Sequence, residues 1–356
     1  MDRPMYLSVL SILYHEPLDL NVQHVFVAYI FPVLACSAIL GNFLFVASVL
    51  ANELRKKTTG ILLMSSNIAS IILTVASTCI VYYPWIFRQR QRTGTKIPCN
   101  ILVFTHHTMA TWSVYLLSCA CVERYIAICH PMSKYSIRSQ TVVRQSLKLL
   151  VGTFIASFII NSPMIWFSGL TVVQGLPDFA NVTFCYYTEE NWYMKIHEYV
   201  EMTLYCIIPF IMICFCNVSI IRKIYFHKTI LELFRLEDRQ SCERIGNWSL
   251  PHRTQAIKLA TILLPIAFLH LVFSLAVVLS VILEETVTRN SSDKLLLLTV
   301  SYCAAQLQAG FYFYVNIALS PVFRRAFKRL FRCETPVSSQ SDFRSHQYPS
   351  VSNDRF

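Results

Sequence analysis

Long uncharged stretches dominate the chain and alternate with short segments rich in charge. A helix of about 20 apolar residues crosses the roughly 30 Å hydrocarbon core of a bilayer. Seven uncharged stretches are long enough: Val25–Asn52, Thr58–Phe87, Ile97–Val122, Leu149–Pro177, Met202–Ile221, Leu259–Leu283 and Leu295–Phe323. Because backbone polar groups must be paired inside lipid, each stretch is expected to be a helix. The pattern predicts an all-α membrane protein, a seven-transmembrane helix bundle.

Lysine and arginine gather in alternate connecting segments. They fill the first segment (55–57), the third (134–148), the fifth (222–258) and the region after the last stretch (324–332). Cytoplasmic segments of membrane proteins carry an excess of these residues. We therefore expect the N-terminus to lie outside the plasma membrane. The net charge of +11 is mostly a topology signal and requires no nucleic acid partner.

Composition excludes several classes of protein. The chain is 54% hydrophobic and 14% charged, whereas soluble domains carry about 25% charged residues. No nucleophile triad or metal-ligand cluster is evident, and eight glycines leave little scope for a phosphate-binding loop. The sequence thus predicts a protein that is not an enzyme and has no cofactor. No internal repeat is seen, which argues against transporters built from inverted repeats.

The remaining segments define the domain organisation. Residues 1–24 are expected to be extracellular, 25–320 to form the membrane domain, and 334–356, rich in Ser, Gln and Asp, to be disordered. Between them, residues 321–333 alternate apolar and basic positions with helical period, which is typical of a helix in the plane of the bilayer surface. Cys333 at its end is either a palmitoylation candidate or an ordinary free thiol. Asn181 and Asn290 are glycosylation sequons in predicted outside segments.

The third stretch ends in Glu123-Arg124-Tyr125. An arginine inside a membrane is costly unless it is paired, so Glu123 is its expected partner. This element resembles the signature of rhodopsin-like (class A) G-protein-coupled receptors. The resemblance implies that Glu123 holds Arg124 in an inactive state, and that released Arg124 faces a heterotrimeric G protein.

Further matches extend the resemblance from about residue 25 to residue 333. Cys99 stands 25 residues before Arg124, as the family's disulfide cysteine does, and Cys185 stands where the family places its partner. The resemblance implies a Cys99–Cys185 disulfide that ties the outer loop to the third helix. Smaller matches are Gly41-Asn42, Asn67, Ala69, Ser113, Pro163, Pro209, Phe323-Arg324 and Phe327.

Several of the family's switch positions are altered. By counting along the chain, the acidic residue of the second helix falls on Ile72, and the tryptophan of the fourth falls on Thr153. Other replacements are Asn217 for a fifth-helix tyrosine, Val272 and Ser274 near the Cys-Trp-x-Pro element, and Tyr312 to Asn316 for Asn-Pro-x-x-Tyr. The arginine lock is thus present, while the relays between ligand and lock are rewritten.

A ligand pocket is expected between the outer halves of the helices. Its candidate residues are Tyr83, His106, Met109, Glu201 and Gln306. His106 stands where amine receptors carry an aspartate, and Gln306 where opsins carry their retinal lysine, so both ligand classes are disfavoured. His106 is either a contact or a satisfied core histidine. Glu201 could bind a basic ligand group, reach lipid headgroups or pair with His197.

Charged residues of both signs in the predicted outer segments suit a peptide better than a lipid. The function predicted is therefore a receptor that binds an extracellular peptide and activates a G protein. A chemosensory receptor of the same fold, a channel or transporter, and a non-signalling scavenger remain alternatives. Serines in the tail, among them Ser338 and Ser339, are candidate phosphorylation sites for arrestin binding.

Overall fold

A computed structural model describes residues 29–51, 53–81, 99–130, 142–173, 182–187, 192–237, 264–275, 279 and 306–331. Tyr83, Asn181, Asn290 and Cys333 lie outside the described residues, as does the side chain of Cys185. Within this part, five helices are long and apolar enough to cross a membrane: Phe31–Leu50, Thr58–Ile80, Cys99–Cys129, Val142–Phe167 and Tyr199–Lys223. They fall in the first five predicted stretches. Helical residues 264–275 and 306–319 fall in the sixth and seventh.

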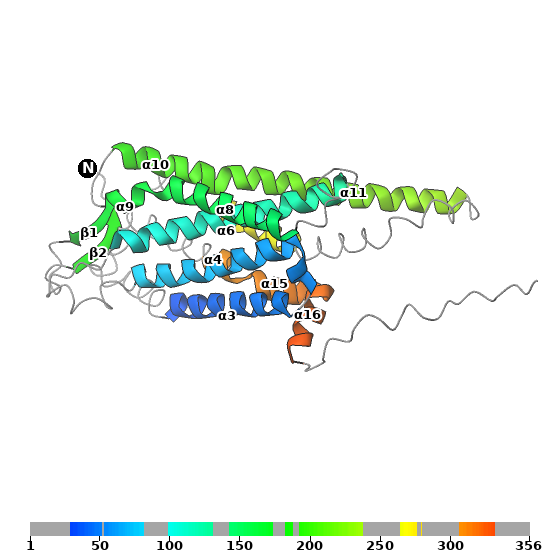
Figure 1. Ribbon diagram of the computed structural model, residues 1–356, viewed down its shortest axis with the longest axis horizontal. Coiled ribbons are helices and arrows are strands. Elements are labelled where there is room, and N and C mark those ends of the chain that lie inside the picture. Colours follow the sequence, from blue (N-terminus) through cyan, green and yellow to red (C-terminus); the bar gives the residue numbers. More distant parts are fainter. Residues whose placement is uncertain are drawn as a thin grey trace, which may run out of the picture.

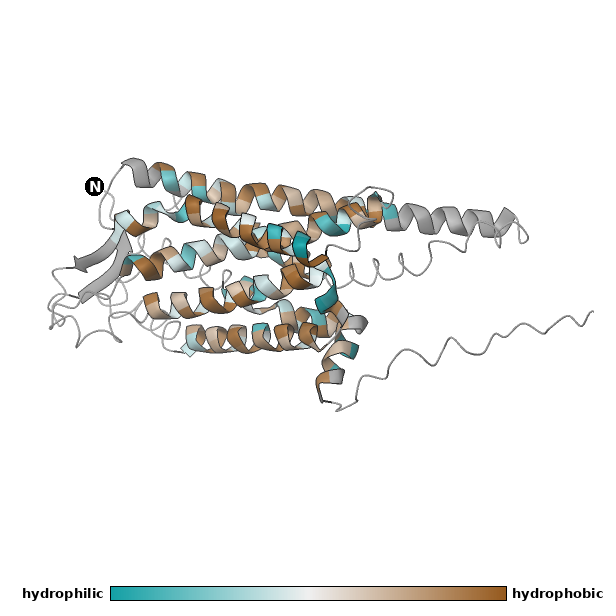
Figure 2. Ribbon diagram, viewed as in Figure 1, coloured by the Kyte–Doolittle hydropathy of each residue, from teal (hydrophilic) through white to brown (hydrophobic). Residues whose placement is uncertain are grey.

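The long helices lie side by side in one bundle (Figure 1). In chain order they are α3 (Phe31–Leu50), α4 (Thr58–Val81), α6 (Cys99–Cys129), α8 (Val142–Asn161), α10 (Trp192–Met202), α11 (Ile208–Glu237) and α15 (Tyr312–Leu319). A short 3₁₀ helix, η2 (Glu53–Lys56), joins α3 to α4. Helix α6 is central, because it packs against α4, α8 and α11. Apolar residues follow the bundle along its length (Figure 2), as a membrane domain requires.

Prolines mark two irregularities in the helices. Pro163 starts the short helix α9 (Pro163–Phe167) directly after α8, with Ser162 at the break. Near Pro209, α10 passes into a π-helical turn, η5 (Thr203–Ile207), before α11 begins. Proline has no N–H to donate to the carbonyl four residues earlier, and the local ladder rearranges around that gap. For Pro209 that carbonyl belongs to Tyr205, inside η5.

A β-hairpin follows the fourth helix and corrects the predicted end of that stretch. The sequence predicted one helix over Leu149–Pro177, but the helix ends at Phe167. Strand β1 (Ser168–Val173) then pairs antiparallel with β2 (Val182–Tyr187), with Leu170 opposite Cys185. The β-branched run Thr171 to Val173 favours a strand. A hairpin also pairs the backbone groups of the two strands with each other.

Helix α11 also differs from its predicted bounds. The fifth uncharged stretch was expected to end at Ile221, whereas α11 continues through Glu237. Residues 222–237 contain neither glycine nor proline and are rich in Leu, Lys, Arg and Glu. These residues favour helix over coil, so the first part of the fifth connecting segment extends the helix beyond the bundle (Figure 1).

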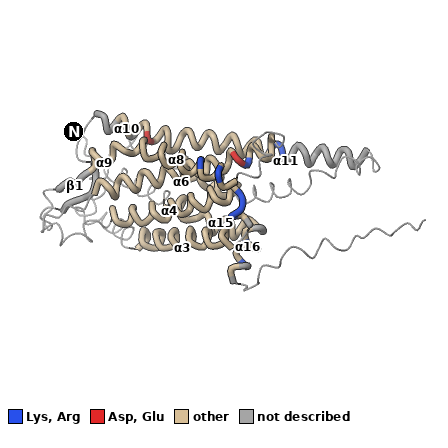
Figure 3. The backbone as a smooth tube through the Cα atoms, viewed as in Figure 1, with Lys and Arg blue, Asp and Glu red and all other residues tan. Residues whose placement is uncertain are grey.

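Helix α16 (Pro321–Phe331) turns away from the bundle direction at the end opposite the hairpin (Figure 1). Phe323 is fully buried, and its ring stacks on Phe45 of α3 at 5.0 Å between centroids. Arg324 donates through Nη1 to the carbonyl of Ala318 at 2.7 Å, which caps the end of α15. In the described part, Lys and Arg gather toward this end of the molecule (Figure 3).

Candidate functional site

Arg124 lies near the end of α6 that is closer to α16, and only 6% of it is exposed. Its Nε donates to Glu123 Oε2 at 2.6 Å and its Nη2 to Glu123 Oε1 at 2.5 Å. The Thr59 hydroxyl, at the start of α4, donates to Glu123 Oε2 as well. Both carboxylate oxygens are thereby occupied, and Arg124 is turned into the bundle. The Glu123–Arg124 pair that the sequence predicted is present. Thr59, which also donates a hydrogen bond to Glu123, was not predicted from the sequence.

Tyr125 points elsewhere. Its hydroxyl lies 3.1 Å from His130 Nε2, and its ring lies 5.5 Å from that of Phe215 on α11. The Glu123-Arg124-Tyr125 element thus contacts α4 through its carboxylate and α11 through its aromatic ring. A motion of α11 relative to α4 would therefore strain this element.

A pocket lies between α4, α6, η5 and the helical residues 306–312. Its cavity volume is about 60 Å³, and the cavity is partly open to the surroundings. It is lined by Ser70, Leu73, Ser77, His106, Ala110, Ser113, Tyr205, Gln306, Gln308, Ala309 and Tyr312. None of these described lining residues is Asp, Glu, Lys or Arg. The polar groups of its mostly apolar wall can therefore form hydrogen bonds but carry no fixed charge.

Two of the sequence-predicted ligand residues line this pocket, and two do not. The Nδ1 atom of His106 lies 2.9 Å from the Ser77 hydroxyl. Gln306 is buried, with 5% of its surface exposed. Met109 and Glu201 are not among the described residues of the wall. Gln308, from the same helical turn as Gln306, lies 2.6 Å from His270 through its Nε2.

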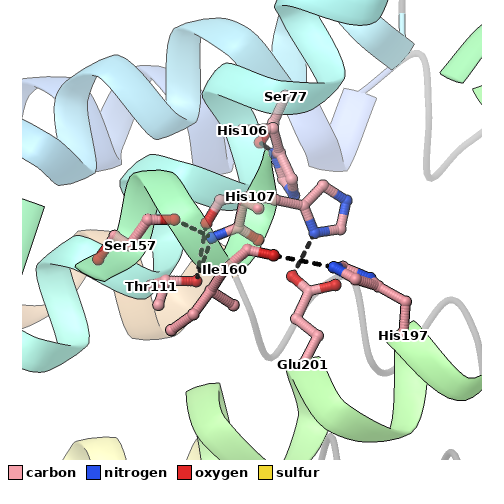
Figure 4. A network of polar contacts seen from close by, with 9 residues as sticks. Ser77, His106, His107, Thr111, Ser157, Ile160, His197 and Glu201 are labelled. Carbon is pink, nitrogen blue, oxygen red and sulfur yellow. Dashed lines mark hydrogen bonds and ion pairs between the residues drawn. The ribbon is translucent and has the colours of Figure 1, made fainter. Parts of the chain in front are cut away.

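Glu201 belongs to a second cluster beside the pocket, between α6 and α10 (Figure 4). Its Oε1 lies 2.5 Å from Nδ1 of His107, an ion-pair contact when the imidazole is protonated. His197 instead donates through Nε2 to the carbonyl of Ile160 at 2.9 Å. His197 was one of the alternatives for the contact of Glu201; its hydrogen bond goes to α8, whereas His107 reaches Glu201 from α6. The Glu201 carboxylate therefore already has a basic partner within the protein.

His107 was missed because sequence spacing within one helix favours partners three or four residues apart. The pairing across two helices depends on how α6 and α10 face each other. The available signal was weaker: an acid and a histidine in the outer halves of adjacent predicted helices. Asn161 joins the same network, because its Nδ2 donates to Thr111 Oγ1 at 3.2 Å and to the Ser157 carbonyl.

Removing one partner of the His107–Glu201 pair is expected to cost more than removing both. His107→Leu leaves a mostly buried carboxylate without its partner, at a cost of about 1–3 kcal/mol. The double variant His107→Leu with Glu201→Gln carries no such charge and should recover about 1 kcal/mol or more. Thermal unfolding of the purified protein measures both. Strictly additive shifts would show that the two side chains are not coupled.

Cys99 begins α6, and its thiol is part of a disulfide. Its partner is not one of the free thiols in the described residues, which are Cys36, Cys79, Cys119, Cys121, Cys129, Cys206, Cys214 and Cys216. Strand β2, which contains Cys185, packs against α6. This arrangement brings the backbone of the expected partner next to the helix that carries Cys99.

Two altered switch positions look different in three dimensions. Ile72 was assigned by counting to the family's acidic position, but it is 40% exposed on the outer face of α4. The inward polar residues of this turn are Ser70 and Thr74, which are both buried. Ile72 therefore does not face the interior of the bundle, and α4 offers no Asp or Glu beside it, since the inward side chains of this turn are hydroxyls. Thr153, at the tryptophan position, accepts a hydrogen bond from Trp112 Nε1 of α6 at 3.2 Å.

A bundle of membrane-length helices, with a buried Glu–Arg pair near one end and an uncharged polar pocket within it, defines a helical membrane receptor. The sequence model of the protein family described as 7 transmembrane receptor (rhodopsin family) matches residues 41–309 of this chain. The chain belongs to this family. Its members are signalling receptors and not enzymes, and the chain is a multi-pass membrane protein.

Individual relatives are distant. Galanin receptor type 1 of Homo sapiens is 23% identical over 324 residues, which cover 88% of this chain and 84% of the relative. Thyrotropin-releasing hormone receptor of Gallus gallus is 22% identical, covering 83% and 75%. G-protein coupled receptor 65 of Homo sapiens is 25% identical over 215 residues, 57% of this chain. In that last comparison, the chain spans 59% of the relative's length.

Proposed function

We propose that this protein is a G-protein-coupled receptor that binds an extracellular peptide and activates a heterotrimeric G protein. The observation that carries the proposal is Arg124, buried and held by both oxygens of Glu123 at the end of the bundle where the basic residues gather. The galanin and thyrotropin-releasing hormone receptors, relatives that cover most of the chain, support a peptide ligand. In this proposal the receptor lies in the plasma membrane, with its N-terminus outside.

A route from pocket to lock runs through the fifth helix. Tyr205 lines the pocket and lies in η5, the π-helical turn that continues directly into α11. Irregular turns of this kind commonly mark functional sites. A ligand that presses on Tyr205 can shift α11, and Phe215 of α11 contacts the Tyr125 ring beside Arg124. In this mechanism the shift weakens the hold of Glu123, and Arg124 extends toward the G protein.

The remaining site assignments complete the proposal. Cys185 is the disulfide partner of Cys99 and ties the hairpin to α6. Asn181 and Asn290 carry glycans, and Cys333 carries a lipid that fixes α16 at the bilayer surface. The serine-containing tail binds arrestin after phosphorylation. The first of these is supported by the disulfide state of Cys99 and by the contact of β2 with α6; the others rest on the family resemblance and on sequence motifs.

Arg124→Ala is expected to reduce agonist-stimulated nucleotide exchange on the G protein by at least about tenfold, which corresponds to the loss of one charge-assisted contact or more. Membranes from cells expressing the receptor are assayed for GTP-analogue binding, basally and with galanin or thyrotropin-releasing hormone. Arg55→Ala, which changes an exposed arginine near the same end, is the matched control. Wild-type exchange in Arg124→Ala would contradict the proposal. Peptide-evoked ion current without G protein would favour the channel alternative.

A further inference from the structure

Gln306 has an amide oxygen, Oε1, without a hydrogen-bond partner at the wall of the pocket, within the part of the chain that the structure describes. Only 5% of Gln306 is exposed. An unpaired buried polar group costs about 1–3 kcal/mol relative to a paired one. The neighbouring Gln308 shows the contrast, since its Nε2 lies 2.6 Å from His270 Nδ1. Gln306 therefore has hydrogen-bonding capacity that an incoming ligand can satisfy.

The surroundings of Gln306 select for a neutral ligand group. The described residues of the pocket wall offer hydroxyls, amides and an imidazole, but no carboxylate, ammonium or guanidinium. A charge brought into this pocket would lose its hydration and find no opposite charge at the wall. The nearby carboxylate of Glu201 is occupied by His107 at 2.5 Å. The ligand group that reaches Gln306 should hence be polar and uncharged.

We propose that Gln306 binds a primary carboxamide of the ligand through two parallel hydrogen bonds. This deepens the proposed function and rests on it, because it names the chemical class of the ligand's innermost group. A glutamine amide places one acceptor beside one donor. A primary carboxamide presents the complementary donor and acceptor, and it still matches if the Gln306 amide rotates by half a turn. A carboxylate offers only acceptors and an ammonium only donors, so each can satisfy one half of the site.

Apolar residues of the pocket wall can contact the hydrocarbon part of a ligand that carries the carboxamide. Leu73, Ala110 and Ala309 line the same pocket as Gln306. A carboxamide attached to a small hydrocarbon therefore places its polar end on Gln306 and its apolar part against these side chains. Benzamide has this form and is a suitable probe.

The test measures binding of benzamide to the purified full-length receptor in lipid nanodiscs by saturation-transfer NMR titration. Benzamide should bind wild type roughly tenfold more tightly than it binds Gln306→Leu, as expected for two neutral hydrogen bonds. Gln145→Leu makes the same change on α8, outside the described pocket wall, and should leave binding unchanged. N,N-dimethylbenzamide keeps the carbonyl acceptor but lacks N–H donors, so it can satisfy only one half of the site and should discriminate less between wild type and Gln306→Leu than benzamide does.

A second variant keeps the test decisive if Gln306→Leu does not fold. Gln306→Glu replaces the amide by a carboxylate, which only accepts, so it should prefer protonated benzamidine, which only donates, over benzamide. Equal benzamide binding to wild type and Gln306→Leu, or no reversal of preference in Gln306→Glu, would overturn the carboxamide assignment. Because no G protein is present, that failure is separate from failure of the signalling proposal.

Discussion

Glu123→Gln is expected to raise ligand-independent nucleotide exchange on the G protein several-fold. In the structure both Glu123 oxygens accept hydrogen bonds from Arg124, and one also accepts from Thr59. Hydrogen bonds to charged groups contribute about 1.5–3 kcal/mol, against about 0.5–1.5 kcal/mol for neutral ones. A glutamine also has one acceptor oxygen in place of two. Weakening the hold by about 1.4 kcal/mol multiplies the population with free Arg124 about tenfold.

The measurement is basal GTP-analogue binding per receptor at the cell surface, compared between wild type and variant at matched expression. Thr59→Val removes one hydrogen bond to the same carboxylate and leaves the Glu–Arg pair intact, so it should give a smaller rise. Adding Arg124→Ala to Glu123→Gln should abolish the increase, since the released group is then absent. A basal rate that does not change in Glu123→Gln would count against Glu123 as the restraint.

The Glu–Arg pair was predictable because its physics is local. The two residues are adjacent in sequence, and an arginine in a membrane requires a partner close by. Thr59 was not predictable in this way, because it reaches Glu123 from α4 across a sequence separation of 64 residues. Which faces of α4 and α6 meet is set by packing, and a uniformly apolar membrane helix gives little periodicity from which to read a buried face.

The same limit applies to Ile72. The helix itself was evident from its uncharged length, but its rotation about its own axis was not. The buried hydroxyl residues in the middle of α4 are Ser66, Ser70, Thr74 and Ser77, spaced by three or four residues, and the exposed Ile72 falls between them. In lipid the outward face is apolar, so small hydroxyl residues, rather than large apolar ones, mark the inward face. Read in this way, the sequence itself contains the correct phase.

The hairpin and the His107–Glu201 pair were missed for a different reason. Hydrophobic length alone does not distinguish a helix that ends at Phe167 from one that runs on through Leu170 and Val173. The change to a strand depends on β2, whose paired residues come 9 to 15 positions later along the chain, from Val173 opposite Val182 to Leu170 opposite Cys185. Likewise, His107 and Glu201 are 94 residues apart. Contacts of this kind are fixed by tertiary packing, which the sequence pattern does not show.

Gly310→Val is expected to remove most of the receptor from the cell surface, because α3 and the seventh helix touch there through their backbones. A Cβ at position 310 would lie 2.7 Å from the Ala38 Cβ and 2.8 Å from its Cα. The backbone of Ala38 cannot swing aside as a flexible side chain would. The helices are also tied beside this point, where Asn42 Nδ2 donates to the Ala309 carbonyl at 2.8 Å.

Forcing extra atoms into such a contact costs about 1–3 kcal/mol and occasionally more, and loss of the Asn42 bond adds about 1 kcal/mol. Together these are a large share of the 5–15 kcal/mol that typically stabilises a folded protein. Gly310→Ala should show a weaker form of the same defect, since it adds the Cβ alone.

Gly152→Val is the matched control, because a Cβ at that exposed position on α8 meets nothing within 4 Å. Both variants lose the same glycine flexibility and add the same side chain, so only the contact with α3 differs. Surface density is measured by flow cytometry of an N-terminal epitope tag, and thermal unfolding is measured on the purified protein. Equal surface density for Gly310→Val and Gly152→Val would show that the α3 contact does not govern folding. A selective loss in Gly310→Val would show that close approach of α3 to the seventh helix, which also positions Gln306 four residues earlier, is required for the bundle.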